Sequence, residues 1–422
     1  MDTALAKARR RILPLIVACY VICFVDRTNI GMAQLTMGAD IGLGPAGFGL
    51  AAAAFFVGYV LFEVPSNLIL HRVGARVWIA RIMITWGLLS AATALVGSPE
   101  GLYVVRFLLG LAEAGFYPGI ILYFTYWFPQ RERARIIALL MAGIPVSFVI
   151  ANPVSGWLVE HAGWQAMFVV EGLPAVVLGV VVWRVLPDRP VNARWLTQRE
   201  SELLTVELAA EAPPEEAVRR TLLSPPVLLI AVVALGTVYA AYLLSLFLPQ
   251  MIAQLWPGAG PTAVGLTSAV PYGFAAVAMV YWGRHSDRSG ERIWHVALPA
   301  LLCAMGFALA AAVQRQPVLV LAALTLAAVG GHAMVPVTYT LPTSMLSGRA
   351  AAAGIALVNS LAHIGAIFGP MATGRLREAT GGFAVPLAVA AAVALVSALA
   401  VLVFGRMRGA VSHITGNVGN RA

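Results

Sequence analysis

Long runs of apolar residues dominate the chain, and polar residues collect in short segments between them. A helix that crosses a bilayer needs about 20 mostly apolar residues, and twelve stretches meet that length. They cover residues 12–33, 46–70, 78–97, 101–127, 136–159, 165–186, 223–253, 263–283, 293–313, 317–341, 349–372 and 382–405. The pattern predicts an all-α membrane protein with twelve transmembrane helices.

The positions of the basic residues predict the orientation of these helices. With the N-terminus inside, 23 of the 28 basic residues fall in alternate loops and the two tails. This count places Arg81 at the end of its helix. Three basic residues fall in outer loops, namely Arg315, Arg375 and Arg377, and Arg27 and Arg106 lie deep within spans. Cytoplasmic loops carry the Lys and Arg excess of membrane proteins, so both termini are predicted to be cytoplasmic.

The longest polar segment follows the sixth predicted span. Residues 188–222 hold 12 of the 47 charged residues, which predicts a cytoplasmic linker between bundles of six helices at 1–187 and 223–422. Within it, Thr197-x-x-Glu200 has the spacing of a capping box and predicts the start of a short amphipathic helix on the inner surface. A solvated connector with partial helix is the alternative.

Composition excludes several classes of protein. The chain is 60% hydrophobic and only 11% charged, whereas soluble proteins carry about 25% charged residues. Its net charge of +9 does not predict a nucleic-acid partner, because the basic residues are spread over short loops instead of gathering on one face. The three cysteines, Cys19, Cys23 and Cys303, lie in apolar runs without metal-ligand spacing.

Motifs for nucleotides and catalysis are missing. The G-x-G-x-x-G pattern at 42–47 lies in a predicted outer loop with no preceding strand, and no phosphate-binding loop or hydrolase motif occurs. We therefore expect no enzyme, no metal and no cofactor, and any uphill transport would use an ion gradient.

An internal repeat supports two related halves. R-x-G-x-R occurs at 72–76 and again at 288–292, an offset of 216 residues that is close to half the chain. Weak internal symmetry of this kind is typical of transporters built from duplicated helical units.

The repeat belongs to a motif that resembles a known family. G-x-x-x-D-R-x-G-x-R is complete at 283–292 and degenerate at 67–76, and with the twelve-helix plan it resembles the major facilitator superfamily. Further motifs resemble the anion:cation symporter branch of that family: Asp26-Arg27-x-Asn29-Ile30-Gly31, Phe62-Glu63-Val64-Pro65-Ser66-Asn67, Arg106-Phe107-x-x-Gly110-x-x-Glu113-Ala114-Gly115, Tyr126-Trp127-Phe128-Pro129 and Leu186-Pro187-Asp188-Arg189-Pro190.

The resemblance implies a transporter of the bacterial inner membrane. Relatives of that branch carry D-galactonate, tartrate, phthalate or hydroxyphenylacetate. Two departures from the branch are His71, in place of an acid in the first-half motif, and Tyr339, in place of tryptophan before Leu341-Pro342-Thr343.

Charged residues inside predicted spans are functional candidates by default, and the geometry of four of them can be estimated from the sequence. Asp26 and Arg106 both fall roughly 8 Å below the outer edge of the bilayer core and could pair. Glu113 lies two helical turns after Arg106, about 10 Å deeper on the same face. Arg27 points about 100° away from Asp26 around their helix.

These charges predict a site for an anion and protons. The planar fork of Arg27 suits a substrate carboxylate, whereas burial favours protonation of Asp26 and Glu113, so these acids would carry coupling protons. A permanent ion-pair network between spans one and four is the alternative. Glu63, near a helix end, and Glu171, before a helix break expected at Gly172-Leu173-Pro174, have open roles.

The resemblance also implies which other residues line the site. Tyr59, Arg106 and Asn359 stand at matching positions, and Tyr242 and Tyr339 are polar candidates in the second half. Asp287 can pair with Arg288 or Arg292 as a latch that opens when the halves rock. The predicted latch residues are Arg72, Arg76, Asp287, Arg288 and Arg292.

Together these observations predict proton-coupled symport of a small organic carboxylate by alternating access. The expected partners are that anion, protons and the lipid bilayer, and the protein is expected to be monomeric. Sodium symport, anion exchange and a non-transporting membrane receptor stay open as alternatives.

Overall fold

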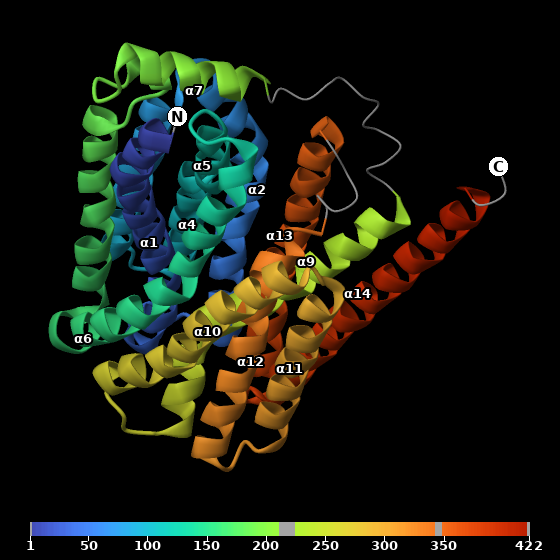
Figure 1. Ribbon diagram of the computed structural model, residues 1–422. Coiled ribbons are helices and arrows are strands. Elements are labelled where there is room, and N and C mark those ends of the chain that lie inside the picture. Colours follow the sequence, from blue (N-terminus) through green and yellow to red (C-terminus); the bar gives the residue numbers. More distant parts are fainter. Residues whose placement is uncertain (1, 211–223, 342–347, 420–422) are drawn as a thin grey trace. The chain divides into compact units, whose positions relative to one another are not determined.

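The computed structural model describes residues 2–210, 224–341 and 348–419, and every regular element in these ranges is helical (Figure 1). The predicted all-α class is confirmed there. Part of the predicted linker and the Pro342-Thr343 sequence fall outside these ranges.

Contacts divide the chain into two compact units. Unit 1 comprises Met1–Ala212 and Pro257–Ala269, and unit 2 comprises Pro213–Trp256 and Val270–Ala422. The long helices of unit 1 are α1 (Asp2–Asp40), α2 (Pro45–Val73), α3 (Ala75–Ala92), α4 (Pro99–Glu113), α5 (Phe116–Thr125), α6 (Gln130–Val185) and α7 (Gln198–Ala210). Those of unit 2 are α9 (Pro225–Leu255), α11 (Ile293–Ala312), α12 (Pro317–Thr338), α13 (Gly348–Thr380) and α14 (Ala384–Gly419), while α10 (Pro261–Ser289) begins in unit 1 and ends in unit 2.

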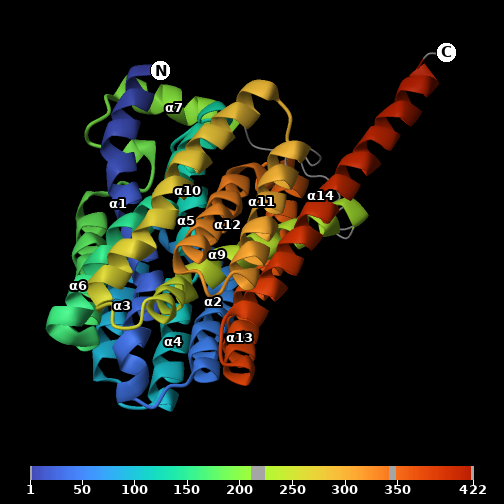
Figure 2. The ribbon, with the colours of Figure 1, turned by 90° about the horizontal axis from the view of Figure 1, so that it is seen from below.

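Within unit 2, α11 packs along α12 and α14, and α9 packs along α13 and α14. In Figure 2, α11 and α12 lie beside each other, and α14 extends along α11. A cluster of buried hydrophobic side chains joins α9, α11, α12, α13 and α14. These contacts position the polar residues of α12 and α13 described below.

Nine of the helices in the described ranges are long and apolar enough to cross a membrane. One of them, α6, has 56 residues, far more than one span needs, and is interrupted at Gly163, where φ is 84°. That interruption lies between the predicted fifth and sixth spans. The number of twelve spans remains a prediction.

The predicted fourth span is not one continuous helix. Helix α4 ends at Glu113, Gly115 adopts φ 84°, and α5 begins at Phe116. A Cβ atom at Gly115 would overlap the Ser66 hydroxyl of α2, so the position requires glycine for space as well as for conformation. The sequence did not reveal this break, because the apolar run continues through it.

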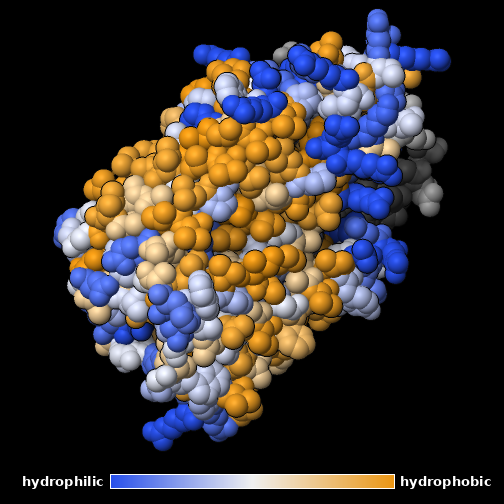
Figure 3. All heavy atoms as spheres, turned by 90° about the vertical axis from the view of Figure 1, so that its left-hand side faces the viewer, coloured by the Kyte–Doolittle hydropathy of each residue, from blue (hydrophilic) through white to orange (hydrophobic). Residues whose placement is uncertain are grey.

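Large apolar side chains cover the outer surface of α6. Val146, Ile150, Trp157, Val177 and Trp183 are all exposed. Figure 3 shows one face of the molecule, on which apolar residues form a broad field and hydrophilic residues collect toward its ends. A surface of this kind is suited to hydrocarbon and not to water.

Helix α7 begins with the predicted capping box. Thr197 N–H donates to the Glu200 carboxylate at 2.9 Å, and Glu200 N–H donates to the Thr197 hydroxyl at 3.3 Å. Glu200 also pairs with Lys7 of α1 at 2.8 Å, and Arg131 of α6 pairs with Glu207 at 2.8 Å. These ion pairs hold α7 across the end of unit 1 where α1 begins (Figure 1).

Candidate transport site

A close contact between α2 and α4 forms one wall of the site in unit 1. A Cβ atom at Gly110 would overlap the Phe55 carbonyl oxygen, and one at Gly58 would overlap the Phe107 carbonyl oxygen. Small residues allow helix backbones to approach in this way. The contact places Phe55 and Tyr59 of α2 against the face of α4 that carries Arg106.

Arg27 and Glu113 form a buried ion pair. Arg27 Nε donates to Glu113 Oε1 at 2.5 Å, and Arg27 Nη2 contacts the same oxygen. Cys23 lies one turn before Arg27 on α1, and its thiol donates to that oxygen at 3.1 Å. Spacing along the chain could not reveal this partner of Glu113, because Arg27 belongs to another helix.

Asp26 is held by neutral groups. It accepts hydrogen bonds from the Ser90 hydroxyl of α3 and, at 3.1 Å, from the Asn29 amide of α1. Asp26 and Arg27 thus bind residues of different helices, which confirms that they point in different directions. The expected pairing of Asp26 with Arg106 is not formed among the described residues: Ser90 and Asn29 bind Asp26 Oδ1, and Asp26 Oδ2 has no hydrogen-bond partner there.

Arg106 is buried, and no acid of the described residues pairs with it. Only 2% of its surface is exposed, and within the described ranges it makes no ion pair. Its guanidinium lies over the Phe55 ring at 4.8 Å, and that of Arg27 lies 5.7 Å from the same ring and 5.3 Å from Tyr59. An aromatic face attracts such cations but does not neutralise their charge.

Sequence reasoning missed Phe55, although Tyr59 was a candidate. The signal was present, because Phe55 precedes Gly58 by one helical turn and therefore lies on the same face of α2. An apolar residue in an apolar run gives no chemical hint of its role. Contact with two guanidiniums distinguishes it only once α1, α2 and α4 are packed.

The two acids whose roles were open are both buried. Glu63 lies on α2, one turn after Tyr59. Glu171 accepts a hydrogen bond from Ser155 at 2.6 Å. The helix break expected after Glu171 is wrong, because α6 continues through Pro174 and is interrupted at Gly163 instead.

Two predicted residues of unit 2 contact each other. The hydroxyl of Tyr339, which directly follows α12, donates to Asn359 Oδ1 of α13 at 3.5 Å. Tyr242 lies on α9, where its carbonyl oxygen accepts a weak hydrogen bond from Ser245 at 3.4 Å. All three side chains are partly exposed within their unit.

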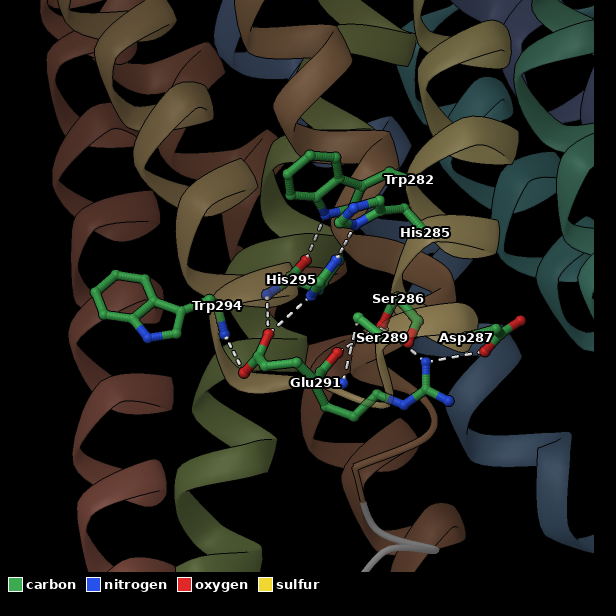
Figure 4. Close-up of polar contacts among 9 residues, drawn as sticks. Trp282, His285, Ser286, Asp287, Ser289, Glu291, Trp294 and His295 are labelled. Atoms are coloured by element: carbon green, nitrogen blue, oxygen red, sulfur yellow. Dashed lines mark hydrogen bonds and ion pairs between the residues drawn. The ribbon is translucent and has the colours of Figure 1, made fainter.

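The turn from α10 to α11 contains the predicted latch of unit 2. Arg292 pairs with Asp287 at 2.9 Å and donates to the Ser286 hydroxyl at 2.7 Å. Figure 4 shows Ser286 and Asp287 at this turn. Arg288 instead lines a surface cavity of about 550 Å³ along α10, beside Tyr281 and Arg284.

Glu291 organises the same turn. It accepts backbone hydrogen bonds from Trp294 at 2.8 Å and His295 at 3.2 Å, and binds His295 Nδ1 at 2.7 Å (Figure 4). His295 Nε2 lies 2.7 Å from His285 Nδ1. Burial opposes ionisation of Glu291, but the hydrogen bonds from His295 and the backbone outweigh it and lower the Glu291 pKa.

The corresponding turn of unit 1 uses a different acid. Asp188 accepts a hydrogen bond from the Arg76 backbone N–H at 2.8 Å and lies against Gly74, whose φ is 97°. The guanidiniums of Arg72 and Arg76 make no ion pair within the described ranges. Asp188 belongs to the Leu186-Pro187-Asp188 sequence, 112 residues from Arg76, so spacing could not reveal this contact.

Comparison with known protein families identifies the family of this chain. The sequence model described as Major Facilitator Superfamily matches residues 16–256 and 242–419. The chain belongs to the major facilitator superfamily. Its relatives are transporters and not enzymes, and this member of the superfamily is a membrane transporter.

Two relatives and one solved structure are similar over nearly the whole chain. A protein of Agrobacterium vitis named "Putative tartrate transporter" is 47% identical, covering 95% of this chain and 91% of the relative. The inner membrane transport protein RhmT of Escherichia coli is 38% identical over 94% of both chains. The crystal structure of a bacterial homolog of the human lysosomal transporter Spinster shares the fold, with a TM-score of 0.70 and 19% identity over 97% of both chains.

Proposed function

We propose that this transporter carries a small organic carboxylate together with protons into the cell, with tartrate as the first candidate. The name of the 47% identical relative supports tartrate, a hydroxy acid. The charged residues suggest only a carboxylate, and the resemblance to the anion:cation symporter branch adds sugar acids and aromatic acids as further candidates. As in RhmT, whose name places it in the inner membrane, the proposed location is the bacterial inner membrane.

The observation that carries this proposal is the buried guanidinium of Arg106, which has no acid partner among the described residues. Leaving a buried charge unpaired costs several kcal/mol. A substrate carboxylate would remove that cost and would bind the planar donor fork of arginine through two hydrogen bonds. Arg27, whose guanidinium also lies near the Phe55 ring, would contact the same anion.

The Arg27–Glu113 ion pair offers a means of coupling to protons. While Glu113 is ionised, it occupies Arg27. A proton on Glu113 would remove its charge and release the guanidinium for the substrate. Proton and anion would therefore each favour binding of the other, which is the thermodynamic condition for symport. Asp26, beside this pair, is proposed as a second proton site.

Unit 2 is proposed to contribute neutral polar groups. Tyr339, Asn359 and Tyr242 would bind hydroxyls or the far end of the substrate. The proposal includes twelve spans with cytoplasmic termini, bundles at 1–187 and 223–422, monomeric function, and alternating access. The pairs at Asp287 and Asp188 are proposed to open and close during that cycle.

Uptake by proteoliposomes tests this function. Protein reconstituted in sodium-free buffer, with an acidic exterior, should accumulate labelled tartrate, and a proton ionophore should abolish accumulation. Uptake that requires sodium would support sodium symport, and uptake that requires internal anion would support exchange. Binding of tartrate without accumulation under any of these gradients would support a receptor.

A further inference from the structure

The surface cavity along α10 has no role in the mechanism above, and its lining is of two kinds. Ala276, Val277 and Val280 form an apolar part, and Arg284 and Arg288 form a basic part. The cavity has a volume of about 550 Å³, and all its lining residues belong to the portion of α10 that lies in unit 2. A ligand that fills it must therefore be apolar at one end and suited to cations at the other.

The apolar and basic parts share one open face of α10. Val277, Tyr281, Arg284 and Arg288 follow one another at intervals of three or four residues, the spacing that aligns side chains along a helix. Val277 is 72% exposed and Tyr281 67%, and both arginines are exposed as well. At a rise of about 1.5 Å per residue, this stripe is roughly 16 Å long, which is enough for a head group and the first part of an acyl chain.

The charges of Arg284 and Arg288 are not balanced by any described residue. Neither guanidinium makes a hydrogen bond or an ion pair within the described ranges. The two acids closest to them in sequence already have partners: Asp287 pairs with Arg292 at 2.9 Å, and Glu291 binds a histidine of α11. The basic part of the cavity therefore keeps a positive charge, which attracts an anion.

Position along the helix matches these two parts to two layers of a membrane. Helix α10 is long and apolar enough to cross a bilayer. The apolar part of the cavity falls within the predicted span at 263–283, and Arg284 and Arg288 follow the predicted cytoplasmic end of that span. Tyrosine and tryptophan are frequent at the level of lipid head groups. Tyr281 and the exposed Trp294, whose ring points away from the other labelled side chains in Figure 4, mark that level here.

His285 fixes the wall of the cavity between its apolar and basic parts. Its ring stacks with those of Tyr281 and Trp282, and its Nδ1 atom lies 2.7 Å from His295 Nε2 (Figure 4). Trp282 Nε1 donates to the His295 carbonyl oxygen at 2.9 Å, which ties the end of α10 to α11. A wall that is already ordered loses little freedom when a ligand binds.

We propose that this cavity binds an anionic phospholipid of the cytoplasmic leaflet, with its phosphate at Arg284 and Arg288 and an acyl chain along Val277 and Val280. Side chains four positions apart on a helix are neighbours, about 6 Å apart at their Cβ atoms, so both guanidiniums can donate to one phosphate. Basic pockets on the cytoplasmic side of membrane helices bind anionic head groups in this way. A small soluble anion would occupy the basic part alone and leave the apolar part unfilled.

Native mass spectrometry of the full-length protein in detergent tests this site with phosphatidylglycerol as the ligand. The wild type should retain phosphatidylglycerol in preference to phosphatidylcholine. Each arginine near an anionic membrane surface strengthens binding about fivefold, so Arg284→Gln/Arg288→Gln should bind phosphatidylglycerol roughly tenfold more weakly, or worse. The control Arg194→Gln/Arg199→Gln removes two exposed arginines elsewhere and should bind as the wild type does. An equal loss in both double variants, or no preference in the wild type, would overturn the proposal.

Photochemical labelling of the wild type covers the case in which the double variant does not fold. Phosphatidylglycerol with a photoreactive acyl chain should label the peptide that contains Val277 and Val280, and unlabelled phosphatidylglycerol should suppress that label. Equal labelling of all helices would show only general lipid contact and would overturn the site. Suppression by inorganic phosphate or by tartrate would also overturn it, because the cavity would then take a soluble anion. Neither measurement involves transport, so both outcomes are independent of the proposed symport.

Discussion

At the scale of single residues, Arg27 and Arg106 lie on the same aromatic ring but differ in their charge balance. Arg27 has Glu113 as an ion-pair partner, whereas Arg106 has none among the described residues. A guanidinium and a carboxylate that pair directly can be separated by a single proton. For this reason the proposed transport cycle begins with protonation of Glu113, which would release Arg27, and not with a change at Arg106.

Arg27→Lys should lower the initial rate of tartrate uptake roughly ten- to hundredfold. Lysine keeps the charge but cannot present two parallel donors, and a hydrogen bond to a charged group contributes about 1.5–3 kcal/mol. Rates in proteoliposomes at equal protein content measure this effect. The matched control is Arg199→Lys in the exposed start of α7, and near-normal uptake by Arg27→Lys would show that Arg27 only supports the scaffold.

Sequence reasoning found most of the charged residues of the site but not their partners. Ionisable residues in apolar runs are conspicuous, so Asp26, Arg27, Arg106 and Glu113 stood out. Which acid meets which base depends on the rotation of α1 against α3 and α4, and matching depth alone favoured Asp26 with Arg106. Neutral partners such as Ser90 carry no signal in a single sequence.

At the scale of helices, the fold around the site depends on glycine contacts. Gly58 and Gly110 bring α2 to α4, and Gly87 and Gly172 bring α3 to α6. Span positions followed from hydropathy because a bilayer sets a minimum apolar length. The helix break after Glu113 could not be predicted from hydropathy, because Gly115 interrupts the helix without interrupting the apolar run.

Gly110→Ala should destabilise the protein by about 1–3 kcal/mol, the usual cost of overpacking, and should strongly impair uptake. The added methyl group would push Phe55 away from the guanidinium of Arg106. Thermal unfolding in detergent together with uptake measures both effects. Gly273→Ala on α10 is the control, since a Cβ atom there meets nothing within 4 Å; equal behaviour of the two variants would contradict the contact.

The turn at Glu291 should make stability depend on pH. Because hydrogen bonds lower the Glu291 pKa below its usual value, its contribution is present above that usual value and is lost as the pH falls through the lowered one. Glu291→Gln should therefore lower the unfolding temperature at pH 7 and have less effect at pH 4. The same loss at both pH values would contradict a role for its charge.

At the scale of the whole molecule, the sequence match to the major facilitator superfamily agrees with the helical fold. The apolar spans and the repeated R-x-G-x-R motif could be recognised from the sequence pattern, because duplication and hydropathy leave long-range marks in a sequence. The bundles at 1–187 and 223–422 stay a prediction, since contacts place Pro257–Ala269 in unit 1. The acid that faces the first repeated turn was not anticipated. It is Asp188, which accepts a hydrogen bond from the Arg76 backbone N–H although the two residues are 112 positions apart.

Proton movement during tartrate uptake tests the central claim most directly. Proteoliposomes with a pH indicator inside, equal pH on both sides and no sodium receive external tartrate. The account predicts that the interior acidifies with the wild type, and that Glu113→Gln exchanges labelled tartrate for unlabelled tartrate with much less acidification. Tartrate uptake by the wild type without acidification, or full acidification with Glu113→Gln, would contradict the account.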